Sequence, residues 1–217
     1  MIKFNEKKHE YTDEKGRKYL SVTTWIGKLF PFHANAIIER IIKSPNSKYY
    51  KWTPAAVRKD WANSSKEGNR VHKACEDYIK EQLITEDAAV KPCVDQFAKL
   101  NFKGKLSSEV RVYDSDYLIA GTIDIIEECD DALYLYDLKT YKIINDERIK
   151  KMSIQLEIYK RLIEKMYNKP TKIMGGLVFE GFVEQKENTK LVFVPGLDKT
   201  EFVDQMFENR KRELGLK

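Results

Sequence analysis

Two segments of the chain place apolar residues at the three- and four-residue spacing of an amphipathic helix. The first follows Ser64, which together with Glu67 fits a capping box that opens a helix. The second spans residues 146–168. The apolar stripes are Val71, Ala74, Cys75, Tyr78, Ile79 and Leu83 in the first segment, and Ile149, Met152, Leu156, Tyr159, Leu162, Ile163 and Met166 in the second. The spacing predicts two helices that each bury one face.

Residues 117–127 and 132–139 have the composition of two strands. Both are rich in aliphatic or aromatic residues, and a short acidic segment separates them. Two such runs joined by a polar turn predict a hairpin. Side chains alternate between the faces of a strand, so Asp137 and Lys139 project on one side and Leu138 on the other. In a tight hairpin, Asp124 lies near the level of Asp137.

The rest of the pattern completes an α/β arrangement. It predicts an N-terminal hairpin, helices at 23–30, 34–43, 54–62, 87–101 and 198–214, and strands at 107–113, 172–183 and 189–194. A block of strands between helices predicts a mixed central sheet flanked by helices. We divide the chain into an N-terminal hairpin and helical lid or arch region, 1–63, and a core, 64–217.

Carboxylates and a lysine at the ends of neighbouring strands form a candidate metal-binding and catalytic site. Asp124 and Asp137 would share a divalent cation, since Mg²⁺ and Mn²⁺ prefer oxygen ligands, with the Lys139 ammonium beside a water or phosphate. The alternative is a set of solvated turn residues with a surface ion pair. His72 flanks the apolar stripe of its helix, where it is either a ligand or an ordinary histidine of the interior or surface.

Gln155 and Tyr159 lie four residues apart, so both can point at one target. A glutamine amide and a tyrosine hydroxyl can donate hydrogen bonds to phosphate oxygens. The alternative is a core tyrosine with a glutamine beside it.

In order and spacing, these residues resemble the PD-(D/E)XK nuclease superfamily, specifically its RecB-like exonuclease branch. The resemblance rests on His72 in a helix, Glu109 at the start of a strand, Gly121-x-x-Asp124, Asp137-x-Lys139 and Gln155-x-x-x-Tyr159, and it covers about residues 64–195. Segments 11–19 and 21–24 are similar to the opening of some of these exonucleases, including the mitochondrial single-strand exonuclease group. Phage exonucleases are similar as well. Ile123 stands where the superfamily's name has Pro.

The resemblance implies a restriction-endonuclease-like core, with an N-terminal helical extension, and a metal site. His72, Asp124, Asp137 and the backbone carbonyl of Leu138 would hold Mg²⁺ or Mn²⁺, as one or two ions. Glu109 would bind a second metal or orient water. A histidine among carboxylates shifts the preference somewhat towards Mn²⁺.

The resemblance also implies an activity. Lys139 would position or help deprotonate the attacking water, and Gln155 and Tyr159 would fix the strand. We expect a DNA exonuclease that acts from free ends, prefers single strands and serves recombination, repair or phage DNA processing. A helicase, recombinase or single-strand-binding protein is the expected partner. The alternatives are an endonuclease of the same superfamily, a non-catalytic DNA-binding or assembly module, or an unrelated enzyme with coincidental motif order.

The small net charge restricts any nucleic-acid-binding surface to a local patch. The chain has 39 Lys and Arg against 34 Asp and Glu, a net charge of +5, so a nucleic-acid surface must be a patch. One basic group follows Lys139 and either tracks a phosphate backbone or forms a solvated helix face; it comprises Lys142, Arg148, Lys150 and Lys151.

Cysteine content and hydropathy indicate which cellular compartment to expect. Three widely spaced cysteines are too few for the four-cysteine iron–sulfur cluster of some relatives and agree with a reducing environment. No stretch approaches the length of a membrane span. We expect a protein of the cytoplasm, in a bacterial or phage-infected cell, without membrane contact.

Residues 30–63 interleave aromatic residues with lysines and arginines. Aromatic rings can stack on unpaired bases while basic side chains follow the backbone. One hypothesis is a lid or arch over the cleft that favours single strands. The alternative is that Trp52 and Trp61 fill core space.

Overall fold

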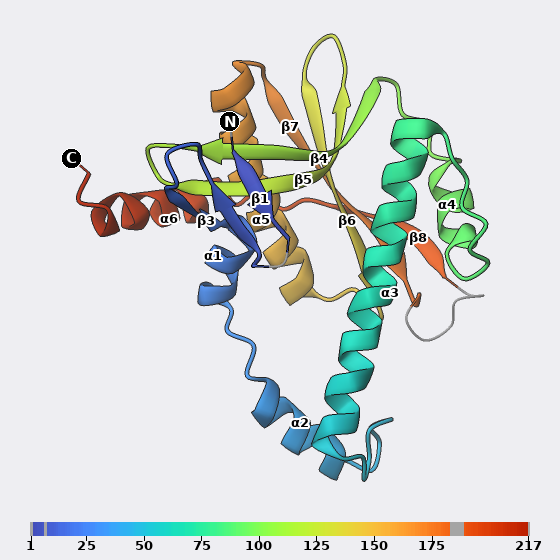
Figure 1. Cartoon of the computed structure of the whole chain (residues 1–217). Coiled ribbons are helices and arrows are strands. Elements are labelled where there is room, and N and C mark those ends of the chain that lie inside the picture. Colours follow the sequence, from blue (N-terminus) through green and yellow to red (C-terminus); the bar gives the residue numbers. More distant parts are fainter. Residues whose placement is uncertain (1, 7, 183–188, 217) are drawn as a thin grey trace.

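The computed structural model describes residues 2–6, 8–182 and 189–216, and a mixed sheet runs through its centre (Figure 1). Within those residues the sheet has eight strands: β1 (Lys3–Asn5), β2 (Glu10–Thr12), β3 (Lys18–Ser21), β4 (Lys105–Asp114), β5 (Ile119–Glu128), β6 (Leu133–Tyr141), β7 (Thr171–Glu180) and β8 (Lys190–Pro195). The pairs β3–β5 and β6–β7 are parallel, whereas β4–β5, β5–β6 and β7–β8 are antiparallel. The predicted mixed central sheet is confirmed.

The sheet divides along one edge of β5. Strand β4 pairs with β5 along the whole of that strand. The opposite edge of β5 pairs with β3 at Ile119 and Ala120, and with β6 from Ile125 onward. Residues 121–124 therefore lie where β3 and β6 diverge, and this is the segment that carries Gly121 and Asp124.

Helices cover both faces of the sheet. The helices are α1 (Val22–Leu29), α2 (Ala34–Lys43), α3 (Pro54–Glu81), α4 (Lys91–Phe97), α5 (Asp146–Tyr167) and α6 (Thr200–Glu213). Helices α1, α5 and α6 share one core cluster, around residues such as Trp25, Leu156 and Phe207. Helices α3 and α4 share another, around residues such as Val71 and Phe97. The result is a sheet between two helical layers.

The predicted helix start at Ser64 is wrong. Helix α3 runs without a break from Pro54, and Thr53 is its N-cap, accepting a hydrogen bond from the backbone N–H of Ala56. Ser64 lies inside the helix, where its hydroxyl donates to the carbonyl of Asp60. A capping box begins a helix only where the preceding residues are not already helical, and here a Thr-Pro start further upstream begins the helix earlier. The division at residue 63/64 passes through α3 and stays a prediction.

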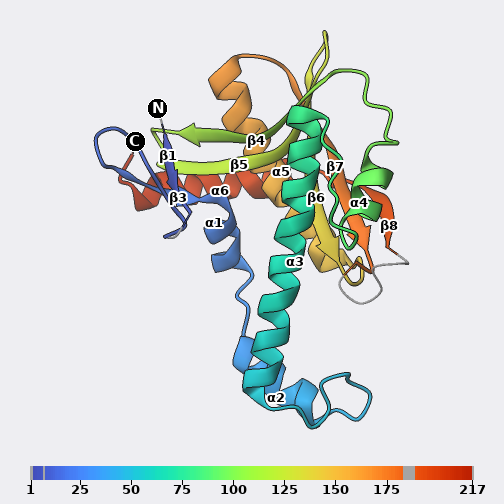
Figure 2. The same ribbon diagram turned by 45° about the vertical axis from the view of Figure 1, so that its right-hand side comes forward.

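Helix α2 and the N-terminal half of α3 project away from the sheet (Figures 1 and 2). We call residues 31–61 the arm. Ile38 on α2 and Val57 on α3 are fully buried, so the two helices of the arm pack on each other. The chain enters the arm from α1 and returns along α3, which makes α3 a single rod joining the arm to the body (Figure 2).

Other elements keep their predicted type with shifted bounds. Helix α4 is shorter than the predicted 87–101, with Pro92 in its first turn. Strand β7 ends at Glu180, and residue 183 of the predicted 172–183 lies outside the described part of the chain. Among the described helices, none combines the length and apolar character needed to cross a bilayer.

Candidate metal centre and cleft

Three neighbouring strands bring three carboxylates into one row. Ile125 on β5 pairs with Tyr136 on β6, so the same register continued by one residue sets Asp124 opposite Asp137. Ser108 and Val110 on β4 pair with Ile125 and Ile123, which sets Glu109 opposite Asp124. Residues opposite each other in antiparallel strands share a face. The tight hairpin expected from the sequence is thus what places Asp124 level with Asp137.

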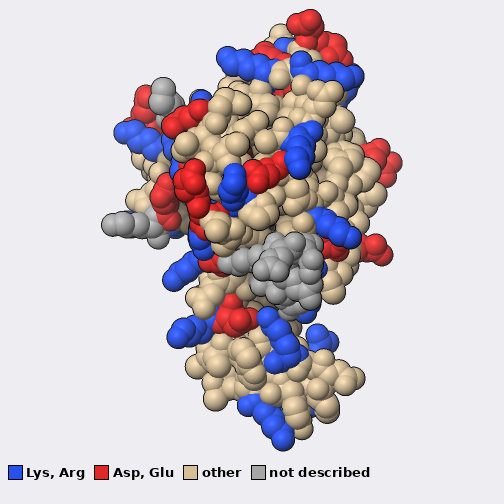
Figure 3. All heavy atoms as spheres, turned by 90° about the vertical axis from the view of Figure 1, so that its right-hand side faces the viewer, with Lys and Arg blue, Asp and Glu red and all other residues tan. Residues whose placement is uncertain are grey.

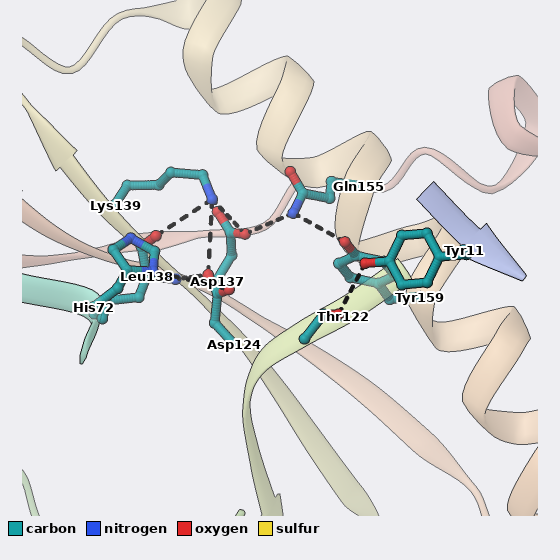
Figure 4. A network of polar contacts seen from close by, with 9 residues as sticks. All are labelled: Tyr11, His72, Thr122, Asp124, Asp137, Leu138, Lys139, Gln155 and Tyr159. Carbon is teal, nitrogen blue, oxygen red and sulfur yellow. Dashed lines mark hydrogen bonds and ion pairs between the residues drawn. The ribbon is translucent and has the colours of Figure 1, made fainter. Parts of the chain in front are cut away.

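Asp137 and Lys139 form an ion pair at the centre of the site (Figure 4). Asp137 is 2% exposed, and its Oδ1 accepts hydrogen bonds from Lys139 Nζ at 2.7 Å and from Gln155 Nε2 at 3.0 Å. Lys139 Nζ also lies 3.8 Å from Asp124 Oδ2 and donates to the carbonyl of Leu138 at 3.3 Å. Asp124 Oδ2 accepts from the backbone N–H of Leu138 at 2.8 Å, so this carboxylate bridges β5 and β6 where the sheet divides.

Burial and crowded charge perturb the titration of these groups. Burial raises the pKa of Asp137, with Asp124 adding to the shift against the opposing charge of Lys139. Burial lowers the pKa of Lys139, but Asp137 and Asp124 outweigh it, so the net shift is upward. Burial lowers the pKa of His72 despite the nearby Asp124. At neutral pH the site therefore presents a neutral imidazole and a lysine ammonium.

Glu109 is the exposed end of the row. Loss of solvation, with the charges of Asp124 and Glu76, raises the pKa of Glu109 to about 7. Its backbone takes a left-handed conformation, φ 55°, which is uncommon for a non-glycine residue and is found often at functional sites. A cation bound here would offset the repulsion between these carboxylates.

The donor set fits a divalent metal. His72, Glu109 and Asp124 each offer a ligand atom, and these atoms lie within 4.8 Å of one another. The imidazole Nδ1 of His72 is 4.0 Å from Asp124 Oδ1. Asp137 Oδ2 is buried and has no hydrogen-bond partner, which leaves it available as a further ligand. One imidazole and several carboxylates suit Mg²⁺ or Mn²⁺.

The structure groups the expected ligands in a different combination from the one the resemblance implied. Glu109 lies with His72 and Asp124, whereas Asp137 directs one oxygen at Lys139 and Gln155. The carbonyl of Leu138 faces Lys139. Which of these residues ligate an ion stays a prediction.

Gln155 and Tyr159 lie behind the carboxylates on α5. Gln155 Nε2 donates to Asp137 and lies 3.5 Å from the Tyr159 hydroxyl. Tyr159 is 3% exposed. These contacts make both residues supports of the carboxylate row, and their expected contact with DNA stays a prediction.

Two glycines let helices approach the site closely. A Cβ on Gly121 would lie 2.5 Å from the Tyr159 ring, so α5 reaches β5 only because that side chain is absent. A Cβ on Gly68 would lie 2.6 Å from the Thr140 hydroxyl, so α3 lies directly against the end of β6. One helical turn after Gly68, the same helix presents His72 to Asp124.

Sequence reasoning missed Tyr11 and Thr122. The Tyr11 hydroxyl lies 2.9 Å from the Thr122 hydroxyl, which ties the N-terminal β2 to the strand that carries Asp124 (Figure 4). Alternation along β5 gave a signal for Thr122, since it shares a face with Asp124. Tyr11 is far away in sequence and gave none.

A cleft of about 450 Å³ opens beside Lys139 and reaches the arm. Its walls carry four basic side chains and no carboxylate: Lys48, Lys139, Lys142 and Arg148. His72 and the aromatic Tyr49, Trp61 and Tyr141 also line it. Of the basic group that the sequence left as either phosphate-tracking or a solvated helix face, Lys142 and Arg148 line this cleft. Lys150 and Lys151 lie over the Phe30 ring instead.

A second groove, of about 990 Å³, opens at the other end of the carboxylate row. Glu109 and Thr122 line it on the sheet side. Its charges balance, because Lys73, Lys80 and Arg111 are matched by Glu6, Glu76 and Glu109. The two ends of the row thus differ in charge.

Comparison with known proteins gives a family. The family model described as the PD-(D/E)XK nuclease superfamily matches residues 36–214. No curated protein matches the chain. The solved structures that match include one described as "Crystal structure of SSO0001", at 14% identity over 89% of this chain and 75% of that one, with a TM-score of 0.43. A likeness at that level carries no argument about fold or function.

Proposed function

Because the chain belongs to the PD-(D/E)XK nuclease superfamily, whose members cleave nucleic acids with divalent metals, we propose that it is a DNA exonuclease of the RecB-like branch. It hydrolyses phosphodiester bonds from free ends and prefers unpaired strands. A histidine from a helix that precedes the strands, directed at Asp124, supports the choice of branch.

The carboxylate row and the side chains around it have separate roles in the proposed reaction. His72, Glu109 and Asp124 would hold the ion, with Asp137 as a further ligand. A bound divalent ion polarises the phosphate and lowers the pKa of a bound water. Lys139, kept protonated by Asp137 and Asp124, donates hydrogen bonds to the attacking water or to a phosphate oxygen and offsets negative charge there. Gln155 holds Asp137 in place.

The charge difference between the two grooves carries the proposal of end-dependent cleavage. On the arm side, the lining offers four basic groups and no carboxylate. Beyond Glu109, as many carboxylates as basic groups line the groove. A polyanionic strand is held firmly on one side of the reacting phosphate only. An enzyme that cuts inside a long strand needs grip on both sides, so the asymmetry favours cutting near an end.

An enzyme of this kind acts on strands that another process has exposed. We propose that it works in recombination, repair or phage DNA processing, in the cytoplasm and beside a helicase, recombinase or single-strand-binding protein. The endonuclease alternative differs in one respect, since it cuts strands that have no end.

The test compares linear single-stranded, linear duplex and circular single-stranded DNA, each with Mg²⁺, Mn²⁺ or EDTA, for the wild type and Lys139→Ala. We expect loss of linear strands only, dependent on metal, and reduced at least about 10²-fold by Lys139→Ala. Cutting of circles that also depends on Lys139 would replace the exonuclease with an endonuclease. Activity equal to wild type in Lys139→Ala would refute the site.

A further inference from the structure

We propose that the cleft between the arm and β6 binds the unpaired strand by stacking, with Trp61 as the surface on which a base rests. This inference rests on the proposed nuclease function and adds the residue and the contact by which the cleft recognises an unpaired strand. It assigns a role to the arm, which the sequence left with two interpretations.

Charge favours a nucleic acid in this cleft. The arm holds six Lys and Arg against two Asp and Glu, so it carries most of the net charge of +5. Basic side chains are prominent on its surface, which forms the lower end of the view in Figure 3. The cleft wall beside the arm adds Lys142 and Arg148, the latter stacked on Tyr141 at 4.5 Å. An acidic ligand that spans arm and active site therefore meets basic groups along its whole length.

The aromatic residues favour unpaired bases. Trp61 is partly exposed, and it is fixed in place by Phe32 at 5.5 Å and Tyr49 at 6.5 Å between ring centroids. Tyr49 is itself held by a hydrogen bond from its hydroxyl to Asp60. Tyr49 and Trp61 line the cleft, whereas Tyr50 and Trp52 do not. A base reaches such a ring only when it is unpaired, because pairing buries its faces in the duplex stack.

Helix geometry sets the distance from the stacking surface to the reacting phosphate. Trp61 and His72 lie on the same continuous helix, 11 residues apart. At 1.5 Å per residue this is about 16 Å along the axis. A stacked strand rises about 3.4 Å per nucleotide, so roughly five nucleotides, or fewer in an extended strand, separate the two points. The cleft therefore contacts an unpaired base several nucleotides away from the phosphodiester bond that is cleaved.

The experiment measures binding without cleavage, in EDTA, by fluorescence anisotropy. The probes are labelled oligothymidylate, an abasic oligomer of the same length and charge, and a blunt duplex. The variants are Trp61→Leu, the conservative Trp61→Phe, and Tyr50→Leu as a control for an arm tyrosine that does not line the cleft. Cleavage of the linear single strand in Mg²⁺ is followed in parallel, and circular dichroism checks folding.

We expect Trp61→Leu to weaken oligothymidylate binding by roughly 5- to 150-fold, the range for one base–aromatic stack. Binding of the abasic oligomer and the duplex should change little, Trp61→Phe should restore much of the loss, and Tyr50→Leu should bind as the wild type does. Equal losses on the oligothymidylate and abasic probes, or no loss at all, would overturn the stacking role. If the wild type cleaves but Trp61→Leu binds as the wild type does, the proposed nuclease function stands and the stacking role is refuted. If binding depends on Trp61 but no DNA is cleaved, the stacking role stands and the proposed nuclease function is refuted.

Discussion

At the scale of single residues, the site depends on how Asp137 is held. This carboxylate is buried, and its Oδ1 receives hydrogen bonds from Lys139 and Gln155. An oriented carboxylate keeps its other oxygen free for a cation. Partners that orient ligands in this way typically change metal affinity or activity by 10- to 100-fold when they are removed.

Gln155→Leu should therefore raise the Mg²⁺ or Mn²⁺ concentration needed for half-maximal cleavage by about 10-fold or more. The measurement is a metal titration of single-strand cleavage. Gln205→Leu is the matched control, because Gln205 is an exposed residue of α6 that bonds only to Asn209 in the described contacts. An unchanged metal requirement in a folded Gln155→Leu protein would remove this residue from the site.

Glu127 is a buried carboxylate with a structural role. It accepts hydrogen bonds from the backbone N–H groups of Lys103 and Gly104 and from the Tyr136 hydroxyl. Burial raises the pKa of Glu127, but these hydrogen bonds outweigh it, so the net shift is downward. A carboxyl whose pKa is lower in the folded state stabilises the protein above its ordinary pKa, and this contribution fades as pH falls through the folded value.

Glu127→Gln should lower the free energy of unfolding at pH 7 by about 1–3 kcal/mol. The difference from wild type should shrink as the pH falls through the lowered pKa of the folded wild-type carboxyl, which then becomes protonated as well. Denaturant titrations at pH 7 and at pH 3 measure both values. A difference that grows on acidification would contradict the lowered pKa.

At the scale of elements, the approach of α5 to β5 sets the back of the site. The ring of Tyr159 occupies the space above Gly121, and Gly121 lies three residues before Asp124. A larger residue would push apart the helix that carries Gln155 and the strand that carries Asp124. Overpacking of a dense core typically costs about 1–3 kcal/mol.

Gly121→Ala should cost about 1–3 kcal/mol of stability and reduce cleavage together with it. Gly27→Ala is the contrasting change, because Gly27 lies in α1 with nothing within 4 Å of an added Cβ. Alanine there should stabilise the helix by roughly 0.5–1 kcal/mol and leave cleavage unchanged. Thermal unfolding and single-strand cleavage of both variants test the pair, and a neutral Gly121→Ala would show that Tyr159 moves aside freely.

At the scale of the whole molecule, charge is distributed unevenly about the carboxylate row. The basic lining is on the side of the arm, and the balanced groove is beyond Glu109. Binding of a phosphate backbone releases counterions, so affinity falls with salt at a slope set by the number of contacts.

Arg148→Ala should weaken single-strand binding and reduce the slope of log affinity against log salt by about 0.7, the value for one contact to a single strand. Lys172→Ala is the control, since Lys172 pairs with Asp131 outside the cleft. Anisotropy titrations between 50 and 200 mM salt, a range of about fourfold, measure the slope. The same slope in Arg148→Ala and wild type would remove Arg148 from the strand path.

The sequence by itself determined the local parts of this protein. Alternation and a short polar turn set Asp124 level with Asp137, and helical spacing identified the apolar faces of the segments that became α3 and α5. These features depend on hydrogen bonds and side-chain directions within a few residues, so they can be predicted from the chain. The predicted cap at Ser64 was also based on a local pattern, but it was wrong because the helix already has its N-cap at Thr53, eleven residues upstream.

Only the tertiary structure decided what meets at the site. Tyr11 reaches Thr122, and Trp61 shares a cleft with Lys139. His72 lies 4.0 Å from Asp124, a grouping for which the sequence offered only the family resemblance. Each of these meetings joins segments far apart in sequence, and none leaves a periodic signal. They follow from how the helices bury their apolar faces on the sheet, with close contacts at Gly68 and Gly121. That packing is a property of the whole core, which no local pattern encodes.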